Sequence, residues 1–126
     1  MEGGQVPRRV RVERIVAASI VTDFDAKWPE VACCVTPDMF SDEYCRDIFG
    51  RVASLDEQGA PVNIKTVWQM GPGTKEDGAR LIELTTHHYF DQLRMEYTRH
   101  CELMKTPHRE ATFADYVTQL IKYNEQ

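Results

Sequence analysis

The sequence predicts an all-α fold, built as a single bundle of six or seven helices. Three observations support this prediction: apolar residues recur at spacings of three and four along most of the chain, strand-like alternation of useful length is lacking, and no internal repeat is present. With 126 residues, 42% of them hydrophobic and 28% charged, the chain suits one soluble domain with one core. We assign this domain to residues 10–126 and a flexible N-terminal tail to residues 1–9.

The first helix is predicted over residues 10–21, because one of its sides collects apolar and small residues. These are Val12, Ile15, Val16, Ser19 and Ile20. A short second helix is predicted over residues 29–34, since Pro29 is accepted in the first turn of a helix but not in its interior. Thr36 or Asp38 is then expected to cap a single turn.

The third helix is predicted to follow Ser41, which can cap it, with acidic residues in its first turn. Its core stripe consists of Tyr44, Cys45, Ile48, Phe49, Val52 and Leu55. Its solvent side is expected to carry Arg46, Asp47, Arg51 and Glu57. Cys45 is interpreted as a small core residue and not as a nucleophile, because no histidine lies in the same helix to lower its pKa.

The remaining helices follow from their stop signals and caps. Gly59 is expected to end the third helix, and Asn63 to cap a short one through Met70. A helix over residues 75–86 is predicted to turn inward Ala79, Leu81 and Ile82. A longer helix follows, with apolar residues Phe90, Leu93, Tyr97, Cys101 and Met104. Thr112 is predicted to cap the last helix, one face of which is apolar.

Charge and cysteine usage limit the classes of function. A net charge of -5 and a pI near 5.3 argue against unaided binding to nucleic-acid phosphates, which usually requires a basic face. Basic residues cluster only as Arg8, Arg9, Arg11 and Arg14. We interpret these four as solvated surface, with an anionic contact as the alternative. Membrane-span and signal-peptide patterns are lacking, so a cytoplasmic protein is expected, with its four cysteines reduced; a disulfide or metal site is the alternative.

Two sequence patterns could indicate a nucleotide-binding, metal or catalytic site, and neither is typical of one. The segment GPGTK at residues 71–75 lacks the spacing of a P-loop and follows a predicted helix where a P-loop needs a strand. The histidines, with Cys101, offer no zinc spacing; they are His87, His88, His100 and His108. We therefore expect no cofactor and no metal. A small enzyme or metal protein built on these residues is the remaining alternative.

Several segments carry a family resemblance when they are taken in order. Residues 12–23, VERIVAASIVTD, look like an opening helix, and residues 35–70 contain a Pro-acid-x-Phe turn, an Arg-x-Ile-Phe helix, a Gly-x-Pro link and a capped short helix. The matching residues are Pro37, Asp38, Phe40, Arg46, Ile48, Phe49, Gly59, Pro61, Val62, Asn63 and Val67. Together they resemble the N-terminal domain of DnaB-type replicative DNA helicases. DGARLIELT at residues 77–85 and FADYVTQLI at residues 113–121 are similar to its later helices.

The sequence also departs from that family. Cys45 stands where the family has a histidine, and Asp77 or Ala79 stands where it has one of two glycines. Residues 86–112 hold a longer helix and loop than the family pattern. The second arm of the family's C-terminal hairpin and its ATPase domain are lacking in this sequence, so motor activity would belong to a longer parent helicase.

The resemblance implies an orthogonal helical bundle with a partial C-terminal helical hairpin. It also implies a non-catalytic domain for protein interaction and oligomerisation in DNA replication, which assembles a helicase ring and contacts primase or a helicase loader. No catalytic residue is carried over. The alternative function is a small helical DNA-binding regulator, in which the arginine cluster would contact the DNA.

Self-association is expected through the last helix, as a homodimer or a larger homo-oligomer. Its apolar face is predicted to lack the cover of a second hairpin arm, and exposed apolar patches commonly mark contacts. The candidate residues are Phe113, Tyr116, Val117, Leu120 and Ile121.

Overall fold

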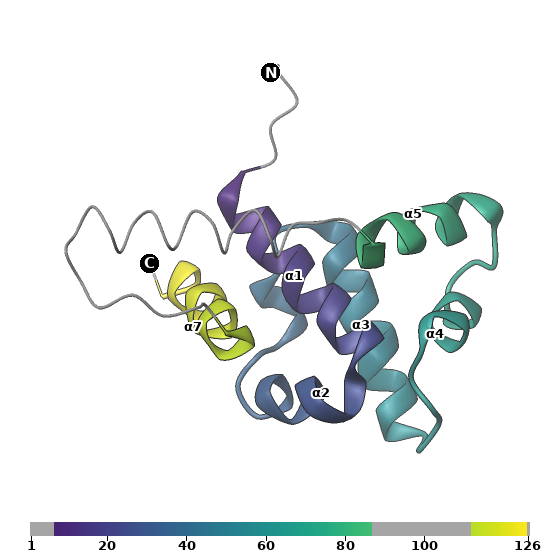
Figure 1. Ribbon diagram of the computed structural model, residues 1–126, viewed down its shortest axis with the longest axis horizontal. Helices are drawn as coiled ribbons and strands as arrows, with labels where there is room; N and C mark the ends of the chain where they lie inside the picture. The colour runs from purple at the N-terminus through teal and green to yellow at the C-terminus, as the bar shows by residue number, and fades with distance from the viewer. Residues whose placement is uncertain (1–6, 87–111, 126) are drawn as a thin grey trace.

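The structure, a computed structural model, describes residues 7–86 and 112–125. These residues form six α-helices and one short 3-10 helix, without a β-strand, which confirms the all-α prediction. The elements, labelled as in Figure 1, are α1 (Arg8–Thr22), α2 (Phe24–Ala32), η1 (Pro37–Met39), α3 (Glu43–Glu57), α4 (Ile64–Met70), α5 (Lys75–Thr86) and α7 (Phe113–Tyr123). No helix among the described residues has the length and hydropathy to cross a membrane.

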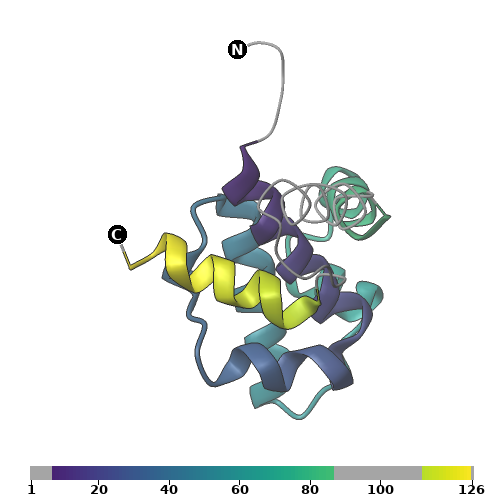
Figure 2. The same cartoon turned by 60° about the vertical axis from the view of Figure 1, so that its left-hand side comes forward.

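Helix α1 lies at the centre of the fold. It contacts α2, α3, α4, α5 and α7, and the last two lie on different sides of it (Figure 1). Val12, Val16 and Ile20 are fully buried, and their spacing of four places them on one face of the helix. Helix α7 crosses α1 in the turned view (Figure 2). Segments from both ends of the described chain therefore share one core.

Three aromatic rings fill the core beside α1. The ring of Phe49 lies 5.2 Å from that of Trp28 and 5.3 Å from that of Phe40, measured between centroids. Both pairs are tilted, an arrangement that aromatic rings favour over a face-to-face sandwich. The indole Nε1 of Trp28 donates a hydrogen bond to Asp56 at 3.1 Å, so this buried ring keeps a polar partner. The rings join α2 and α3 to Phe40, the residue that follows η1.

The predicted boundaries of the first two helices are wrong. Helix α1 begins at Arg8 and not at residue 10, so Arg8 and Arg9 belong to the helix and not to the tail. Helix α2 spans Phe24–Ala32 with Pro29 inside it, where residues 29–34 were predicted. A proline inside a helix removes one backbone bond, but Trp28 and Val31 are buried beside it. Tertiary packing therefore outweighs the local cost of the proline.

The third helix begins as predicted within one residue, but its cap is different. Asp42, and not Ser41, is the N-cap of α3, and its carboxylate accepts a hydrogen bond from the Cys45 N–H at 3.0 Å. The apolar stripe of α3 is buried, including Cys45, while Tyr44 is half-buried. Arg51 was predicted to face solvent and is 6% exposed.

The later helices have the predicted bounds. Only some of the residues that were predicted to face inward are buried. Asn63 caps α4 through a capping box with Thr66, as expected from the sequence. Helix α5 spans the predicted residues and buries Leu81, but Ile82 is 56% exposed and Ala79 is exposed as well. Its inner face is formed by Asp77, Leu81 and Leu84. The helix predicted around residues 90–104 lies outside the described residues.

Helix α7 is part of the core, which corrects the prediction of an uncovered face. Phe113, Tyr116, Val117 and Leu120 are buried, Ile121 is half-buried, and α7 packs on α1 and α2. Two polar contacts fix its position as well: Arg8 donates to Gln119 at 3.1 Å, and Asn124 donates to the Met39 carbonyl at 2.9 Å. The cover that we expected from a partner is supplied by this chain's own helices.

Candidate functional site

A buried carboxylate joins α1 to the start of α3. Glu13 is fully buried and accepts hydrogen bonds from the Ser41 N–H at 2.9 Å, the Ser41 hydroxyl at 2.8 Å and the Asp42 N–H at 2.8 Å. The guanidinium of Arg9 pairs with the same carboxylate at 3.1 Å. Buried carboxylates need such partners, and four donors satisfy this one. Glu13 therefore fixes the N-terminus of α3 against α1.

A buried ion pair joins α3 to α5. Arg51 donates from both terminal nitrogens to the two carboxylate oxygens of Asp77, each at 2.9 Å. Asp47 accepts a further bond from Arg51 at 2.7 Å, and the Val67 carbonyl of α4 accepts one at 3.3 Å. The bond from Arg51 is the main cause that lowers the pKa of Asp77, and the bond to Asp77 is the main cause that raises the pKa of Arg51. Three helices therefore meet at one guanidinium.

Gly71 leaves the space that this guanidinium occupies. A Cβ atom added at Gly71 would meet the Arg51 guanidinium carbon and both terminal nitrogens far inside van der Waals contact. The backbone of Gly71 has φ -94°, which any residue can adopt, so the requirement concerns space alone. The breaker run GPG consequently has a packing role here.

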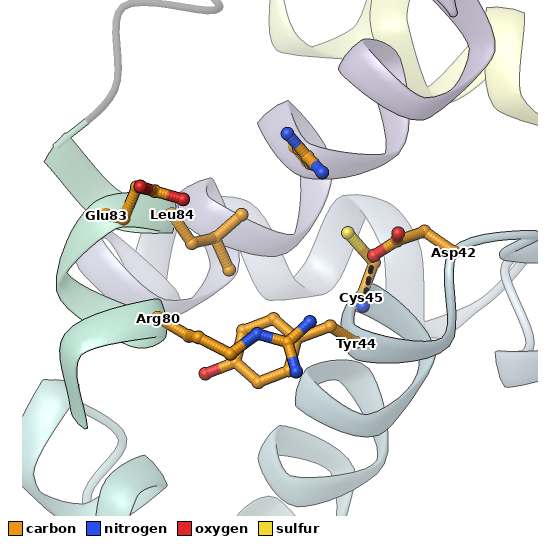
Figure 3. A pocket seen from close by; sticks show the side chains of 7 residues that line it. Asp42, Tyr44, Cys45, Arg80, Glu83 and Leu84 are labelled. Carbon is orange, nitrogen blue, oxygen red and sulfur yellow. Dashed lines mark hydrogen bonds between the residues drawn. The ribbon is translucent and has the colours of Figure 1, made fainter. Parts of the chain in front are cut away.

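A small hollow of about 50 Å³ opens between α1, α3 and α5 (Figure 3). It is lined by Arg14, Asp42, Tyr44, Cys45, Arg80, Glu83 and Leu84. The guanidinium of Arg80 lies over the ring of Tyr44, with its central carbon 4.0 Å from the ring centroid, which is a cation–π contact. A shallower depression continues from Tyr44 and Arg80 toward Val10 and Asp47. The Tyr44–Arg80 stack therefore lies where the two depressions meet.

The titratable groups of the hollow are unsuited to nucleophilic chemistry. Burial, with the charge of Asp42 as the second cause, raises the pKa of the Cys45 thiol well above its usual range. Burial and the charge of Asp77 raise the pKa of Tyr44 to about 12. Both groups stay protonated near neutral pH, whereas an activated nucleophile needs a lowered pKa. Among residues 7–86 and 112–125, no group of three or more His, Cys, Asp and Glu side chains is arranged to hold a metal ion.

The arginine cluster does not form one surface. Arg8 and Arg9 contact α7 through Gln119 and Asn124, each at 3.1 Å. Arg14, on the same helix, lines the hollow beside α3 and α5. Part of the cluster thus has a structural role that its sequence pattern did not indicate. The predicted histidine group lies outside the described residues.

The buried charged residues were missed by the sequence prediction, although signals for them exist. Arg51 follows Tyr44 by seven positions and Ile48 by three, which is the spacing of the buried stripe. Asp77 precedes Leu81 by four and so shares its face. We classed Arg51 as solvent-facing because it is charged. Such a buried ion pair is indicated in a sequence when a charged residue takes a position in the apolar stripe of one helix and an oppositely charged residue does so in another helix.

Comparison with known families agrees with this architecture. A family described as the DnaB-like helicase N-terminal domain matches residues 5–100. The chain belongs to this family. The match includes the elements that carry Glu13, the Arg51–Asp77 pair and the hollow, and it ends before α7. No curated protein and no solved structure matched the chain.

Proposed function

We propose that this chain is a non-catalytic protein-interaction and assembly domain that acts in DNA replication, within a replicative helicase or as a free-standing relative. The observation that carries the proposal is the family match over residues 5–100. Its main partner is another domain of the same family, either a second copy of this chain or the corresponding domain of a replicative helicase. Primase and a helicase loader are the further partners that we expect.

The chemistry of the hollow supports binding over catalysis. Its thiol and phenol have raised pKa values, so neither supplies a nucleophile near neutral pH. The hollow has a volume of about 50 Å³, far below the roughly 300–1,000 Å³ of ordinary small-molecule sites, and the adjoining depression reaches about 650 Å³ but is open to solvent. Such a hollow suits the tip of a single side chain from another protein.

We place the contact at the surface that α1, α3 and α5 share, around the Tyr44–Arg80 stack. Tyrosine and arginine are the residue types that, with tryptophan, dominate the energetics of protein interfaces. Arg80 is exposed and Tyr44 half-buried, so a partner can reach both. We do not place the contact on the apolar face of α7, because this chain's own helices bury most of it.

Sedimentation velocity tests the proposal. The 126-residue chain is measured up to about 100 μM, where a micromolar contact is well populated, alone and with the replicative helicase and primase of the same source. We expect a concentration-dependent oligomer or a complex with one of these proteins. A single monomeric species in every mixture would contradict the assembly role.

Thermal unfolding with added ATP or Zn²⁺ tests the non-catalytic part separately. A ligand that binds the native state raises the melting temperature. We expect no change with either ligand. A clear rise, or hydrolysis of ATP by the purified chain, would contradict this part while leaving the assembly role open to the first experiment.

A further inference from the structure

An open cleft of about 520 Å³ lies at the far end of α3 from the Tyr44–Arg80 stack. One wall is residues 22–25, where α1 passes into α2, and the other is residues 59–62, which link α3 to α4. Figure 1 shows both walls near the lower edge of the molecule. Helix α3 has 15 residues and is therefore about 22 Å long. The cleft consequently lies outside the proposed contact surface.

Both walls of the cleft are turns that backbone hydrogen bonds hold in place. Asp23 ends α1 and begins α2, and its N–H donates to the Ser19 carbonyl at 2.9 Å. Gly59 follows α3 with a positive φ of 69°, a conformation that favours glycine. The N–H of Ala60 then donates to the Leu55 carbonyl at 2.9 Å. The cleft is thus formed before any ligand arrives, so binding has little ordering of the chain to offset.

Apolar side chains give a ligand something to cover. Four of the eight residues that line the cleft are apolar: Phe24, Ala60, Pro61 and Val62. Phe24, Ala60 and Val62 pack against the core yet remain half-buried, and Pro61 is exposed. The ring of Phe24 is stacked on that of Trp28, with centroids 5.8 Å apart, which fixes its orientation. A ligand with an apolar part therefore gains free energy by covering this surface.

The charges around the cleft select a basic ligand. Asp23 and Asp25 line it and are exposed, and no basic residue lines it. The amino group of Lys27 lies 3.8 Å from the Asp23 carboxylate. Within the part of the chain that the structure describes, the side chain of Asp25 has no hydrogen bond or ion pair. Beyond the cleft, the exposed Asp56 adds a further carboxylate, which accepts from Trp28.

Arginine and lysine combine the two properties that this cleft requires. Their long aliphatic stems cover apolar surface while their charged heads stay in water. A guanidinium or ammonium group also forms its stronger hydrogen bonds with carboxylates. The clustered arginines of a second copy suit the cleft less well, because Arg8 and Arg9 are engaged with α7 of their own chain.

We propose that the cleft docks a basic segment of a different protein, in which an arginine or lysine stands next to an apolar residue. The cationic head pairs with Asp25, and the stem and the apolar neighbour cover Phe24 and Val62. This docking site is independent of the proposed assembly function.

Fluorescence anisotropy with a dye-labelled hexapeptide that alternates arginine and leucine tests the proposal on the 126-residue chain. At physiological ionic strength, where long-range attraction is screened, we expect binding that saturates at one peptide per chain. Asp25→Lys places a like charge against the ligand and should weaken binding about tenfold or more. The matched control is Glu30→Lys, which makes the same change of charge at an exposed position of α2 outside the cleft and should bind like wild type.

A second peptide, with serine in place of each leucine, tests the apolar part and should bind more weakly than the first. Equal binding of the two peptides, or equal weakening by Asp25→Lys and Glu30→Lys, would overturn the proposal, because either result indicates general attraction between charges. Circular dichroism of both variants should match wild type, since both side chains are exposed.

Nuclear magnetic resonance locates the bound peptide. The amide signals of Gly59 and Val62 should shift on addition of the first peptide, whereas that of Arg80 should not. The largest shifts at Arg80 would overturn the proposed position. In sedimentation velocity Asp25→Lys should assemble like wild type, so a loss of peptide binding without a loss of assembly distinguishes this site from the proposed contact surface.

Discussion

The two sides of α1 are held by different forces. On one side, α2, α3 and α7 pack through aromatic and aliphatic side chains such as Phe49 and Leu120. On the other side, α4 and α5 meet α3 at the Arg51–Asp77 pair. The first side relies mainly on the burial of apolar area, whereas the second adds to its buried Val67, Leu81 and Leu84 a pair of charges that would be costly to bury alone.

This difference predicts how each side responds to substitution. An apolar contact loses free energy in proportion to the area and volume that a mutation removes. A buried ion pair responds asymmetrically: removing one partner leaves an uncompensated charge, whereas replacing both with apolar groups is often neutral. The following changes separate the two sides, from the largest expected effect to the smallest.

The largest effect is expected from Tyr116→Asp combined with Leu120→Asp. Both positions are fully buried, and each unpaired buried charge costs several kcal/mol, which together rival the roughly 5–15 kcal/mol that stabilise a typical domain. We expect the chain to lose its cooperative thermal transition by circular dichroism. Thr118→Asp on the exposed side of α7 is the matched control and should remain folded. A folded double variant would mean that α7 is not part of the core.

The next effect concerns the ion pair. Asp77→Ala leaves Arg51 buried without its main partner and should lower the free energy of unfolding by about 3–5 kcal/mol. The double variant Arg51→Met/Asp77→Leu should recover most of this loss, because no charge is left buried. Urea unfolding measures both. Equal losses in the single and double variants would show that the pair acts through packing volume alone.

Acidification should remove the contribution of the Arg51–Asp77 pair to the free energy of unfolding. The pKa of Asp77 is lowered from its ordinary value of 3.8, so its pairing stabilises the fold fully above that value and progressively less as pH falls through the folded-state pKa. The difference in unfolding free energy between wild type and Asp77→Asn should be constant from neutral pH to about pH 4 and shrink below it. A difference that grows on acidification would have the wrong sign for a lowered pKa.

The smallest effects are expected from two glycines with opposite outcomes. Gly71→Ala places a methyl group against a guanidinium that Asp77 and Asp47 hold in place, so a loss of about 1–3 kcal/mol is expected. Gly50→Ala meets no atom within 4 Å inside α3 and should stabilise the chain by about 0.5–1 kcal/mol. Thermal unfolding of both variants shows whether each substitution lowers or raises the stability of the chain. A neutral Gly71→Ala would show that Arg51 can move aside.

The two sides also differ in how far the sequence predicts them. Apolar spacing identified the buried stripe of α3 and the apolar face of α7, because period and burial coincide there. It placed Ile82 inward because Ile82 is apolar, yet Asp77 takes a position on the buried face of α5 by pairing with Arg51. Pairing between distant charges depends on which helices meet, and spacing within one helix does not contain that information.

The candidate site was predictable only in part for the same reason. The family resemblance indicated an interaction domain, but the prediction of an uncovered face on α7 was wrong, because the pattern of one helix does not show whether another part of its own chain covers it. The Tyr44–Arg80 stack joins α3 to α5 across 36 positions, and no local pattern marks it. Likewise, Pro29 inside α2 is tolerated because Trp28 and Val31 are buried in the core.

The most direct measurement compares Arg80→Glu with Lys122→Glu in sedimentation velocity with the helicase of the same source. Both variants reverse one exposed charge, the first at the Tyr44–Arg80 stack and the second on α7. We expect Arg80→Glu to weaken assembly, with itself or with the helicase, while Lys122→Glu assembles like wild type and both keep wild-type circular dichroism. Equal assembly by the two variants, or a loss confined to Lys122→Glu, would contradict a contact surface at α1, α3 and α5.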